Sequence, residues 1–253
     1  MSSLEVLFTP ADFGALSQRD LSQTCCVVFD VLRATSTMVT ALWNGAEAIL
    51  PVQEIADALA ARERLGGPVL LAGERAGVRI GPDRSGGTTF DLGNSPGEFT
   101  ADVVRGKIIV MTTTNGTRAL RACLNAQRTF AACFLNLTAT AEAIRLAGNP
   151  PLLLVCSGTV EQAAYEDILG AGALCDELWP RYQESPVADS AQVAREIYLH
   201  ARSDLAQALA RSRNGRRLLS HPTLHGDVSF CARRDALPLV AELGRDGLVR
   251  RQR

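Results

Sequence analysis

An acid, an arginine and three hydroxyl groups follow the first long apolar run of the chain. Cys25 to Phe29 is continuously apolar, which predicts a strand buried on both faces. The next string, DVLRATST, contains Asp30, Arg33, Thr35, Ser36 and Thr37. Ligands of open α/β sheets bind beyond the carboxyl ends of the strands, where helix N-termini present N–H groups to anions. Asp30 could therefore hold a cation and the other four residues an anion. Simple helix capping, with an Asp30–Arg33 ion pair, explains the pattern equally well.

A second predicted strand end carries the same kinds of group. The apolar run Ile108 to Met111 leads into TTTNGTR, which contains Thr113, Thr114, Asn115, Gly116, Thr117 and Arg118. An arginine in the first turn of a helix opposes the helix dipole, whose N-terminus favours negative charge. A bound anion therefore explains Arg118 better than helix stability does.

The interval from Gly73 to Gly106 is rich in glycine, proline and charge. A stretch of this length without regular structure is usually functional. Glu74 and Arg75 directly follow a predicted strand and could bind a ligand, although a structural ion pair between them is an equal alternative. Ser95 and Glu98 fit a capping box, which leaves Asn94 as the candidate ligand contact.

A third strand end combines small residues with acids. Ser157 and Gly158 follow the apolar run Leu152 to Val155, and Glu166 and Asp167 come near the start of a predicted helix. This acidic pair could complete a Mg²⁺ site, because Mg²⁺ prefers one or two carboxylates with waters and phosphate oxygens. Stabilisation of the helix N-terminus is the structural alternative.

Several known solutions to phosphate chemistry are absent from the sequence. It contains neither a GxxxxGK[ST] loop nor a GxGxxG fingerprint. A Cys-x5-Arg phosphatase loop after Cys156 would need arginine where Gln162 stands. The three histidines lie late in the chain, and a zinc site is not expected from their spacing.

Composition limits the partners of the chain. Its 253 residues are 47% apolar and carry a net charge of −1, so no general attraction to nucleic acid or to anionic membranes is expected. The start of the sequence lacks a basic and apolar leader, and no apolar run is long enough to span a membrane. The seven cysteines form no CxxC pair. We therefore expect a cytoplasmic protein with buried free thiols, and a homo-oligomer is left open.

The order of apolar runs predicts the fold class. Six runs alternate with helix-like segments up to Val155, which indicates an α/β protein with a largely parallel sheet flanked by helices. Helices predicted over Ala163 to Leu178 and Ala188 to Ala210 make the last third a helical cover. We expect one unit over residues 1–253; two closely packed lobes, with the site in the cleft between them, are the alternative arrangement.

Five strings in one order carry a family resemblance. DVLRATST, LLAGER, FDLGNSP, TTTNGTRAL and CSGT with YED are similar to the 2-phosphosulfolactate phosphatase (ComB-like) family, and SRNGRRLL and DVSFCARRDALPLV resemble its C-terminal region. The resemblance implies the family's α/β fold, a Mg²⁺ requirement, and hydrolysis of 2-phospho-3-sulfolactate to 3-sulfolactate and phosphate in coenzyme M biosynthesis. The segment Val78 to Thr89 departs from the family pattern, so a phosphatase of altered substrate specificity is an alternative.

The resemblance also assigns residues. Asp30, Arg33, Glu74 and Asp167 are expected to be catalytic, and the metal ligands are expected among Asp30, Glu74, Glu166 and Asp167. The expected substrate-binding residues are Thr35, Thr37, Arg75, Asn94, Ser95, Thr113, Asn115, Gly116, Thr117, Arg118 and Gly158. Ser36, Thr114 and Ser157, from the same hydroxyl-rich turns, are expected to bind the substrate as well.

The expected substrate is small, phosphorylated and strongly anionic, so that Arg33, Arg75 and Arg118 would match its three acid groups. The nucleophile is left open between a hydroxide produced at the metal and the Asp30 carboxylate. A non-catalytic sensor of a phosphorylated metabolite is the alternative from another class, because it needs the arginines but not the acids. Nucleic-acid binding through Arg211, Arg213, Arg216 and Arg217 is disfavoured, and a solvated helix face explains that run more simply.

Overall fold

The computed structural model describes residues 2–252, and its strands form one ten-stranded sheet in the order β1-β8-β2-β7-β9-β10-β3-β6-β4-β5. The strands are β1 (Leu4–Leu7), β2 (Cys25–Phe29), β3 (Ala48–Val52), β4 (Val69–Arg75), β5 (Val78–Arg79), β6 (Ile108–Thr112), β7 (Arg128–Ala132), β8 (Leu152–Cys156), β9 (Ala241–Leu243) and β10 (Val249–Arg251). Neighbours within β1-β8-β2-β7 and within β3-β6-β4 run parallel, and β5, β9 and β10 pair antiparallel. The predicted α/β class with a largely parallel sheet is confirmed.

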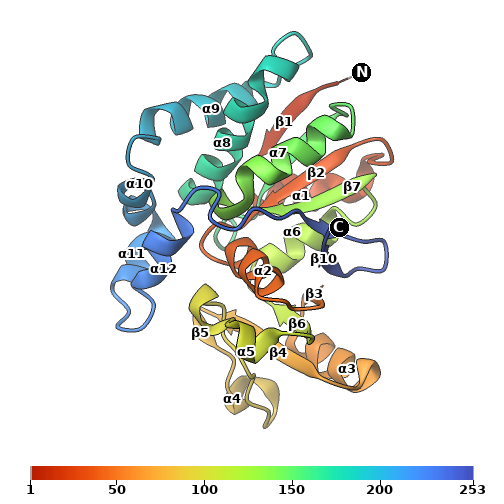
Figure 1. Cartoon of the computed structure of the whole chain (residues 1–253), viewed down its shortest axis with the longest axis vertical. Helices are drawn as coiled ribbons and strands as arrows, with labels where there is room; N and C mark the ends of the chain where they lie inside the picture. The colour runs from red at the N-terminus through yellow and green to blue at the C-terminus, as the bar shows by residue number, and fades with distance from the viewer. Residues whose placement is uncertain (1, 253) are drawn as a thin grey trace.

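Helices cover the outer sides of the sheet and also lie between its two parallel groups of strands (Figure 1). They are α1 (Pro10–Gly14), α2 (Ala34–Trp43), α3 (Ile55–Leu65), α4 (Pro82–Ser85), α5 (Ala101–Val104), α6 (Gly116–Ala122), α7 (Leu137–Leu146), α8 (Tyr165–Tyr182), α9 (Asp189–Ala201), α10 (Leu205–Arg211), α11 (Arg213–Leu219) and α12 (Gly226–Cys231). Three single 3₁₀ turns are η1 (Ala15–Gln18), η2 (Pro96–Glu98) and η3 (Phe134–Asn136).

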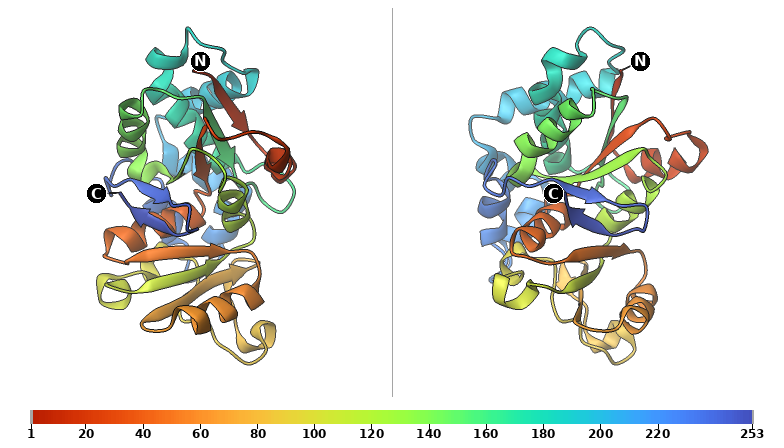
Figure 2. Two further views of the ribbon diagram at one scale, coloured as in Figure 1. Left: turned by 90° about the vertical axis from the view of Figure 1, so that its right-hand side faces the viewer. Right: turned by 45° about the vertical axis from the view of Figure 1, so that its right-hand side comes forward.

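The C-terminal hairpin β9–β10 joins the two parallel groups of strands. β9 pairs with β7 and β10 pairs with β3, so the hairpin lies between the groups in Figure 2. Arg128 on β7 donates two hydrogen bonds to Glu242 on β9, at 2.8 and 2.9 Å. The predicted helical cover of the last third is present as α8 to α12, but this hairpin after it was not expected from the sequence. Strands of three residues are too short to show a periodicity that could be read from sequence.

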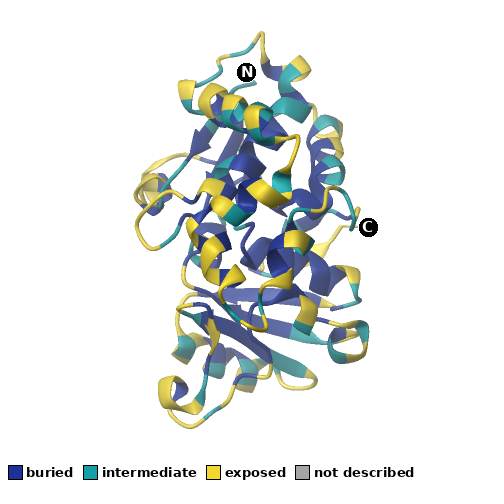
Figure 3. Cartoon of the chain, turned by 90° about the vertical axis from the view of Figure 1, so that its left-hand side faces the viewer, coloured by how far each residue is buried: buried dark blue, intermediate teal, exposed yellow. Residues whose placement is uncertain are grey.

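Side-chain alternation produces three successive cores. Val27 and Phe29 of β2 face the core under α7, α8 and α9, whereas Cys26 and Val28 face a second core that contains α2 and α6. That second core also receives Ile49 of β3, whose neighbour Leu50 points into a third core against α3. Both groups of strands thus enclose α2, nine of whose ten residues are buried. Figure 3 shows that the strands are largely buried and that exposed residues gather on the outer helices and loops.

Some predicted segments differ from the structure. The helix expected over Ala188 to Ala210 is divided into α9 and α10, with Asp204 capping α10 through the amide of Gln207. The interval Gly73 to Gly106 contains short elements, including β5, α4 and the capping box of Ser95 and Glu98. All seven cysteines are free and buried, as predicted. No helix within residues 2–252 has both the length and the apolarity needed to cross a bilayer.

The hairpin gives a stability prediction. Val249 of β10 is fully buried and is paired with Ile49 and Leu243, so Val249→Ala should lower the free energy of unfolding by about 1.5–3 kcal/mol. Val193→Ala, the same change at a half-exposed site on α9, should stay within about 0.5 kcal/mol of the wild type. Urea unfolding followed by circular dichroism measures both, and equal effects would show that the hairpin does not hold the sheet together.

Candidate active site

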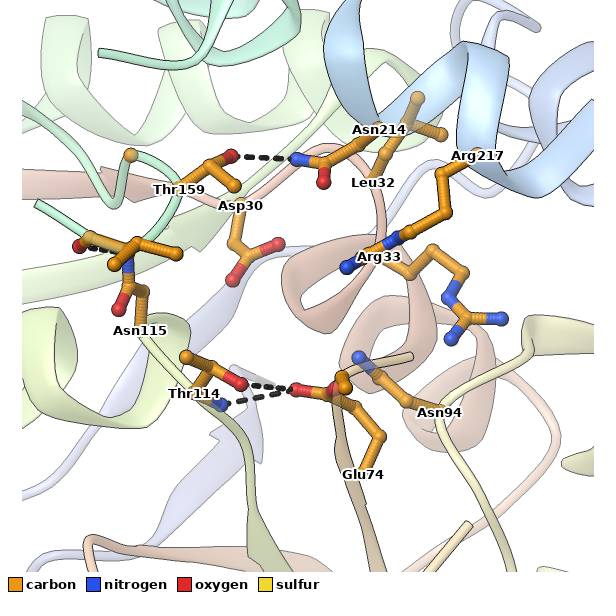
Figure 4. A pocket seen from close by; sticks show the side chains of 13 residues that line it. Asp30, Leu32, Arg33, Glu74, Asn94, Thr114, Asn115, Thr159, Asn214 and Arg217 are labelled. Atoms are coloured by element: carbon orange, nitrogen blue, oxygen red, sulfur yellow. Dashed lines mark hydrogen bonds between the residues drawn. The ribbon is translucent and has the colours of Figure 1, made fainter. Parts of the chain in front are cut away.

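A cavity of about 290 Å³ opens at the carboxyl ends of strands from both parallel groups (Figure 4). Its walls come from the ends of β2, β8, β4 and β6, and α11 forms one side. The lining residues are Asp30, Leu32, Arg33, Glu74, Ala76, Asn94, Thr114, Asn115, Gly158, Thr159, Val160, Asn214 and Arg217. Seven of these were predicted from the sequence: Asp30, Arg33, Glu74, Asn94, Thr114, Asn115 and Gly158.

Asp30 is held by the helix that follows it. Its Oδ1 accepts the Ala34 amide at 3.1 Å, and its backbone carbonyl accepts the Thr35 amide at 3.0 Å. The first free N–H groups of α2 therefore bind Asp30, rather than being left for an anion. Burial, with added repulsion from Glu74 and Glu166, raises the pKa of Asp30 to about 7.

Gly116 lets a second helix approach the same carboxylate. A Cβ at this position would lie 2.4 Å from Asp30 Oδ2 and 2.7 Å from the Ala34 methyl group. The start of α6 can therefore lie against Asp30 only where the helix lacks a side chain. The glycine in TTTNGTR acts through this close packing, and it does not line the cavity.

Glu74 faces Asp30 from the other group of strands. Its Oε1 accepts the amide and the hydroxyl of Thr114 at 3.0 and 2.9 Å, and its Oε2 accepts the Gly77 amide at 2.6 Å. The carboxylate is 7% exposed, and these three donors fix its orientation. The alternative of a Glu74–Arg75 ion pair is wrong, because Arg75 donates to the backbone carbonyl of Glu74.

Two more acids lie beneath the cavity. Asp167 Oδ1 accepts the Val31 amide at 2.8 Å and Oδ2 accepts the Gly158 amide at 3.0 Å, so this carboxylate joins the loops after β2 and β8. Burial, followed by repulsion from Asp30 and Glu166, raises the pKa of Asp167 well above its usual range. Glu166 Oε1 accepts the Asn214 amide at 2.6 Å.

The site contains buried acceptor oxygens without donors. Among residues 2–252 these include Asn94 Oδ1, Asn115 Oδ1 and Glu166 Oε2. A buried acceptor without a partner is costly, and a cation would satisfy it. All the candidate ligands are oxygens, which fits a hard cation such as Mg²⁺. The four acids predicted as metal ligands do not converge by themselves: in the described part of the chain no three Asp, Glu, His or Cys side chains form a metal cluster.

The three arginines predicted to bind the substrate all interact with protein groups. Arg33 is 3% exposed and donates to Asp227 Oδ2 at 2.9 Å and to the Gly77 carbonyl at 3.0 Å. It pairs with Asp227 and not with Asp30, so the alternative of an Asp30–Arg33 ion pair is wrong. Arg75 donates to the carbonyls of Glu74 and Gln53 and to the Thr112 hydroxyl.

Arg118 lies outside the cavity. Its half-exposed guanidinium pairs with Glu161 at 3.2 Å and lines a separate groove beside α1. The residue lies in the first turn of α6, as predicted, but it is absent from the lining of the cavity.

The predicted hydroxyl groups mostly bind the backbone. Thr35 and Ser36 donate to the carbonyls of Asp30 and Val31, and Thr37 donates to the carbonyl of Asn94. Thr113 and Thr117 bond with each other, and Ser95 donates to Asp227. These groups shape the loops around the cavity. The Ser157 hydroxyl is also buried, but it has no hydrogen-bond partner among residues 2–252.

Sequence reasoning missed Asn214 and Arg217, which line the cavity from α11. Both lie in SRNGRRLL, a string that resembles the family but whose arginines we interpreted as a solvated face. The signal was the spacing: residues three apart share a helix face, so an asparagine and an arginine point to the same side.

Comparison with known proteins supports the resemblance. A family model described as 2-phosphosulpholactate phosphatase matches residues 13–246. A probable 2-phosphosulfolactate phosphatase of Pseudothermotoga lettingae is 39% identical over 98% of this chain and 98% of its own length. Proteins of the same name from Caldanaerobacter subterraneus subsp. tengcongensis and Caldicellulosiruptor saccharolyticus are 34% and 38% identical, over 96% and 93% of this chain and 97% and 96% of their own lengths. The family predicted from the sequence is confirmed.

The buried Arg33–Asp227 pair predicts a large loss of stability. Asp227→Ala leaves the Arg33 guanidinium buried without its counter-charge and should lower the free energy of unfolding by about 3–5 kcal/mol. Asp246→Ala breaks an exposed pair with Arg250 and should cost less than about 1 kcal/mol. Denaturant unfolding compares the two variants. Similar small losses in both would mean that Arg33 does not depend on Asp227.

Proposed function

The chain belongs to the 2-phosphosulfolactate phosphatase family, whose members are phosphoric monoester hydrolases, and we propose that it hydrolyses 2-phospho-3-sulfolactate to 3-sulfolactate and phosphate with Mg²⁺ as cofactor. The observation that carries this proposal is the set of buried acceptor oxygens around Asp30 and Glu74. Two cavity carboxylates surrounded by amide oxygens without donors repel a phosphate unless a cation lies between them. Such a set fits a cation-dependent phosphatase better than a protein that binds phosphate through arginines and N–H groups.

Asp30 and Glu74 are the residues that would hold Mg²⁺, with Asn94 and Asn115 as neutral oxygen donors beside them. When bound, the cation would offset the negative charge of the phosphoryl oxygens and favour attack at phosphorus. The chain's own contribution is orientation. Three donors fix Glu74, the Ala34 amide fixes Asp30, and Asp167 holds the loops after β2 and β8 in register beneath them.

Glu166 and Asp167 have supporting roles in this proposal. Asp167 does not line the cavity, and its two oxygens accept the amides of Val31 and Gly158, so it acts as a positioning residue for Asp30 and not as a cation ligand. Glu166 keeps one oxygen without a donor and is the acid that could approach the cation from below.

The cofactor is tested by removing it. Phosphate release from synthetic 2-phosphosulfolactate should vanish in EDTA and return with excess Mg²⁺. Mg²⁺ at a hundred times its Kd should also raise the free energy of unfolding by about 2.7 kcal/mol, because it binds the folded chain alone. Full turnover in EDTA would refute the cation, and Mg²⁺ binding without phosphate release would favour the non-catalytic sensor.

Asp30→Asn tests the carboxylate without disturbing its surroundings. The amide oxygen can still accept the Ala34 N–H, so stability should stay within about 1 kcal/mol of the wild type. Turnover should fall more than about a hundredfold, because the cation loses a charged ligand. Asp102→Asn, on an exposed position of α5, is the matched control and should leave both quantities unchanged. If Asp30→Asn retained activity, the carboxylate would have no part in the reaction.

A further inference from the structure

Arg217 has a guanidinium that points into the cavity, as Figure 4 shows. It extends from α11 toward the space between Asp30, Glu74 and Asn94, whereas the guanidinium of Arg33 is directed away from Asp30. No ion pair or hydrogen bond to another residue of the 2–252 range involves the Arg217 guanidinium. A cation placed against a cavity without a carboxylate partner is available for an anion from outside the chain.

The surroundings of Arg217 fix its position. Asn214, one turn earlier, donates to Thr159 Oγ1 at 2.7 Å and to Glu166 Oε1 at 2.6 Å, which ties α11 to the floor of the site. Leu218 is buried next to it. A Cβ on Gly77 would lie 3.4 Å from Arg217 Cζ, so the guanidinium lies over the bare backbone of that glycine. Arg217 is exposed at the cavity mouth, but its helix is anchored on two sides.

The charges in the cavity are arranged in two regions. Asp30 and Glu74 bring negative charge to one region, where a phosphate requires the cation. Arg217 brings positive charge to the other region. Because Arg33 is neutralised by Asp227, Arg217 is the arginine left to recognise an acid directly. A planar guanidinium binds the oxygens of a carboxylate or sulfonate in a bidentate manner.

We infer that Arg217 is a specificity-determining residue, which binds an acid group on the carbon skeleton of the substrate while the phosphate lies at the carboxylate side. The inference rests on the proposed function. The bound group is a carboxylate or a sulfonate, and both present coplanar oxygen pairs to the guanidinium. A phosphomonoester without such a group gains nothing from Arg217.

Substrates that differ by one acid group test the inference. We would compare the wild type with Arg217→Met on 2-phosphosulfolactate, 2-phospholactate (no sulfonate), 2-sulfoethyl phosphate (no carboxylate) and ethyl phosphate (neither). The kcat/KM for 2-phosphosulfolactate should fall about ten- to a hundredfold, mainly through KM, and that for ethyl phosphate less than about threefold. The single-acid substrate that shows the same loss identifies the group that Arg217 binds.

Matched variants separate recognition from helix structure. Arg216→Met changes a neighbouring exposed arginine, whose guanidinium contacts the carbonyl of Arg211. This variant should leave kcat/KM for all four substrates unchanged. Arg217→Lys keeps the charge and should restore part of the discrimination. An equal loss on all four substrates in Arg217→Met, or an unchanged profile, would overturn the inference.

A binding measurement keeps this inference apart from the proposed function. If the wild type hydrolysed none of the four compounds, the proposed function would fail, and calorimetric titration with 3-sulfolactate in the presence of Mg²⁺ would decide on Arg217. At least tenfold weaker binding by a folded Arg217→Met variant would support its role. Equal binding by both proteins, or none by either, would refute it.

Discussion

Mutual repulsion among carboxylates is the constraint on which the site depends. Asp30 and Glu74 lie at strand ends of the two parallel groups and line one small cavity, and Glu166 and Asp167 lie beneath it in the first turn of α8. Burial and mutual repulsion raise the pKa of Asp30 to about 7 and hold that of Asp167 well above its usual range. The fold counters this repulsion with backbone N–H donors. Hydrogen bonds reach the carboxylate oxygens from the amides of Val31, Ala34, Gly77 and Gly158. The oxygens that remain without donors mark where a cation would complete the balance.

Gly77 connects three parts of the site that are distant in sequence. Its amide donates to Glu74, its carbonyl accepts Arg33, and its bare Cα lies against Arg217. The residue has φ of +82°, a conformation that glycine adopts without strain. A shift of this turn would therefore move the cavity acid, the buried ion pair and the cavity arginine together. The segment Val78 to Thr89, which we expected from the sequence to differ from the family pattern, begins directly after it.

The sequence indicated where the site lies better than what each side chain does. Asp30, Glu74 and Asn115 line one cavity, and the sequence could bring them together because strand ends can be read from apolar runs and a parallel sheet brings its carboxyl ends to one edge. The partner of Arg33 could not be read in this way. Asp227 is 194 residues away, and only the packing of α12 brings it to the arginine. Local spacing says nothing about such a pairing, so the sequence could not show that Arg33 is bonded to Asp227.

The same limit explains why Arg217 was missed. In α11 the arginines at 213, 216 and 217 look alike in sequence, but anchoring by Asn214 decides which of them faces the cavity. The hairpin β9–β10 was not predicted for a related reason. Its short strands form where they pair with β7 and β3, and those strands are distant in the sequence. Long, strongly periodic elements were therefore predictable, whereas features fixed by contacts between distant segments were not.

Charge balance explains why a single arginine at the cavity, Arg217, without a protein partner in the described part of the chain, would be enough to recognise the proposed substrate. A phosphate placed directly on several guanidinium groups would be bound tightly before and after reaction, which lowers KM without helping turnover. Here Arg33 is neutralised by Asp227, and Arg75 and Arg118 bond to protein groups elsewhere. In the proposed reaction the phosphoryl group would lie at the carboxylate side, where interactions can strengthen as charge develops at the reacting atoms. Arg217 would supply constant binding energy at a non-reacting acid group, and such remote binding would help to orient the ester between Asp30 and Glu74.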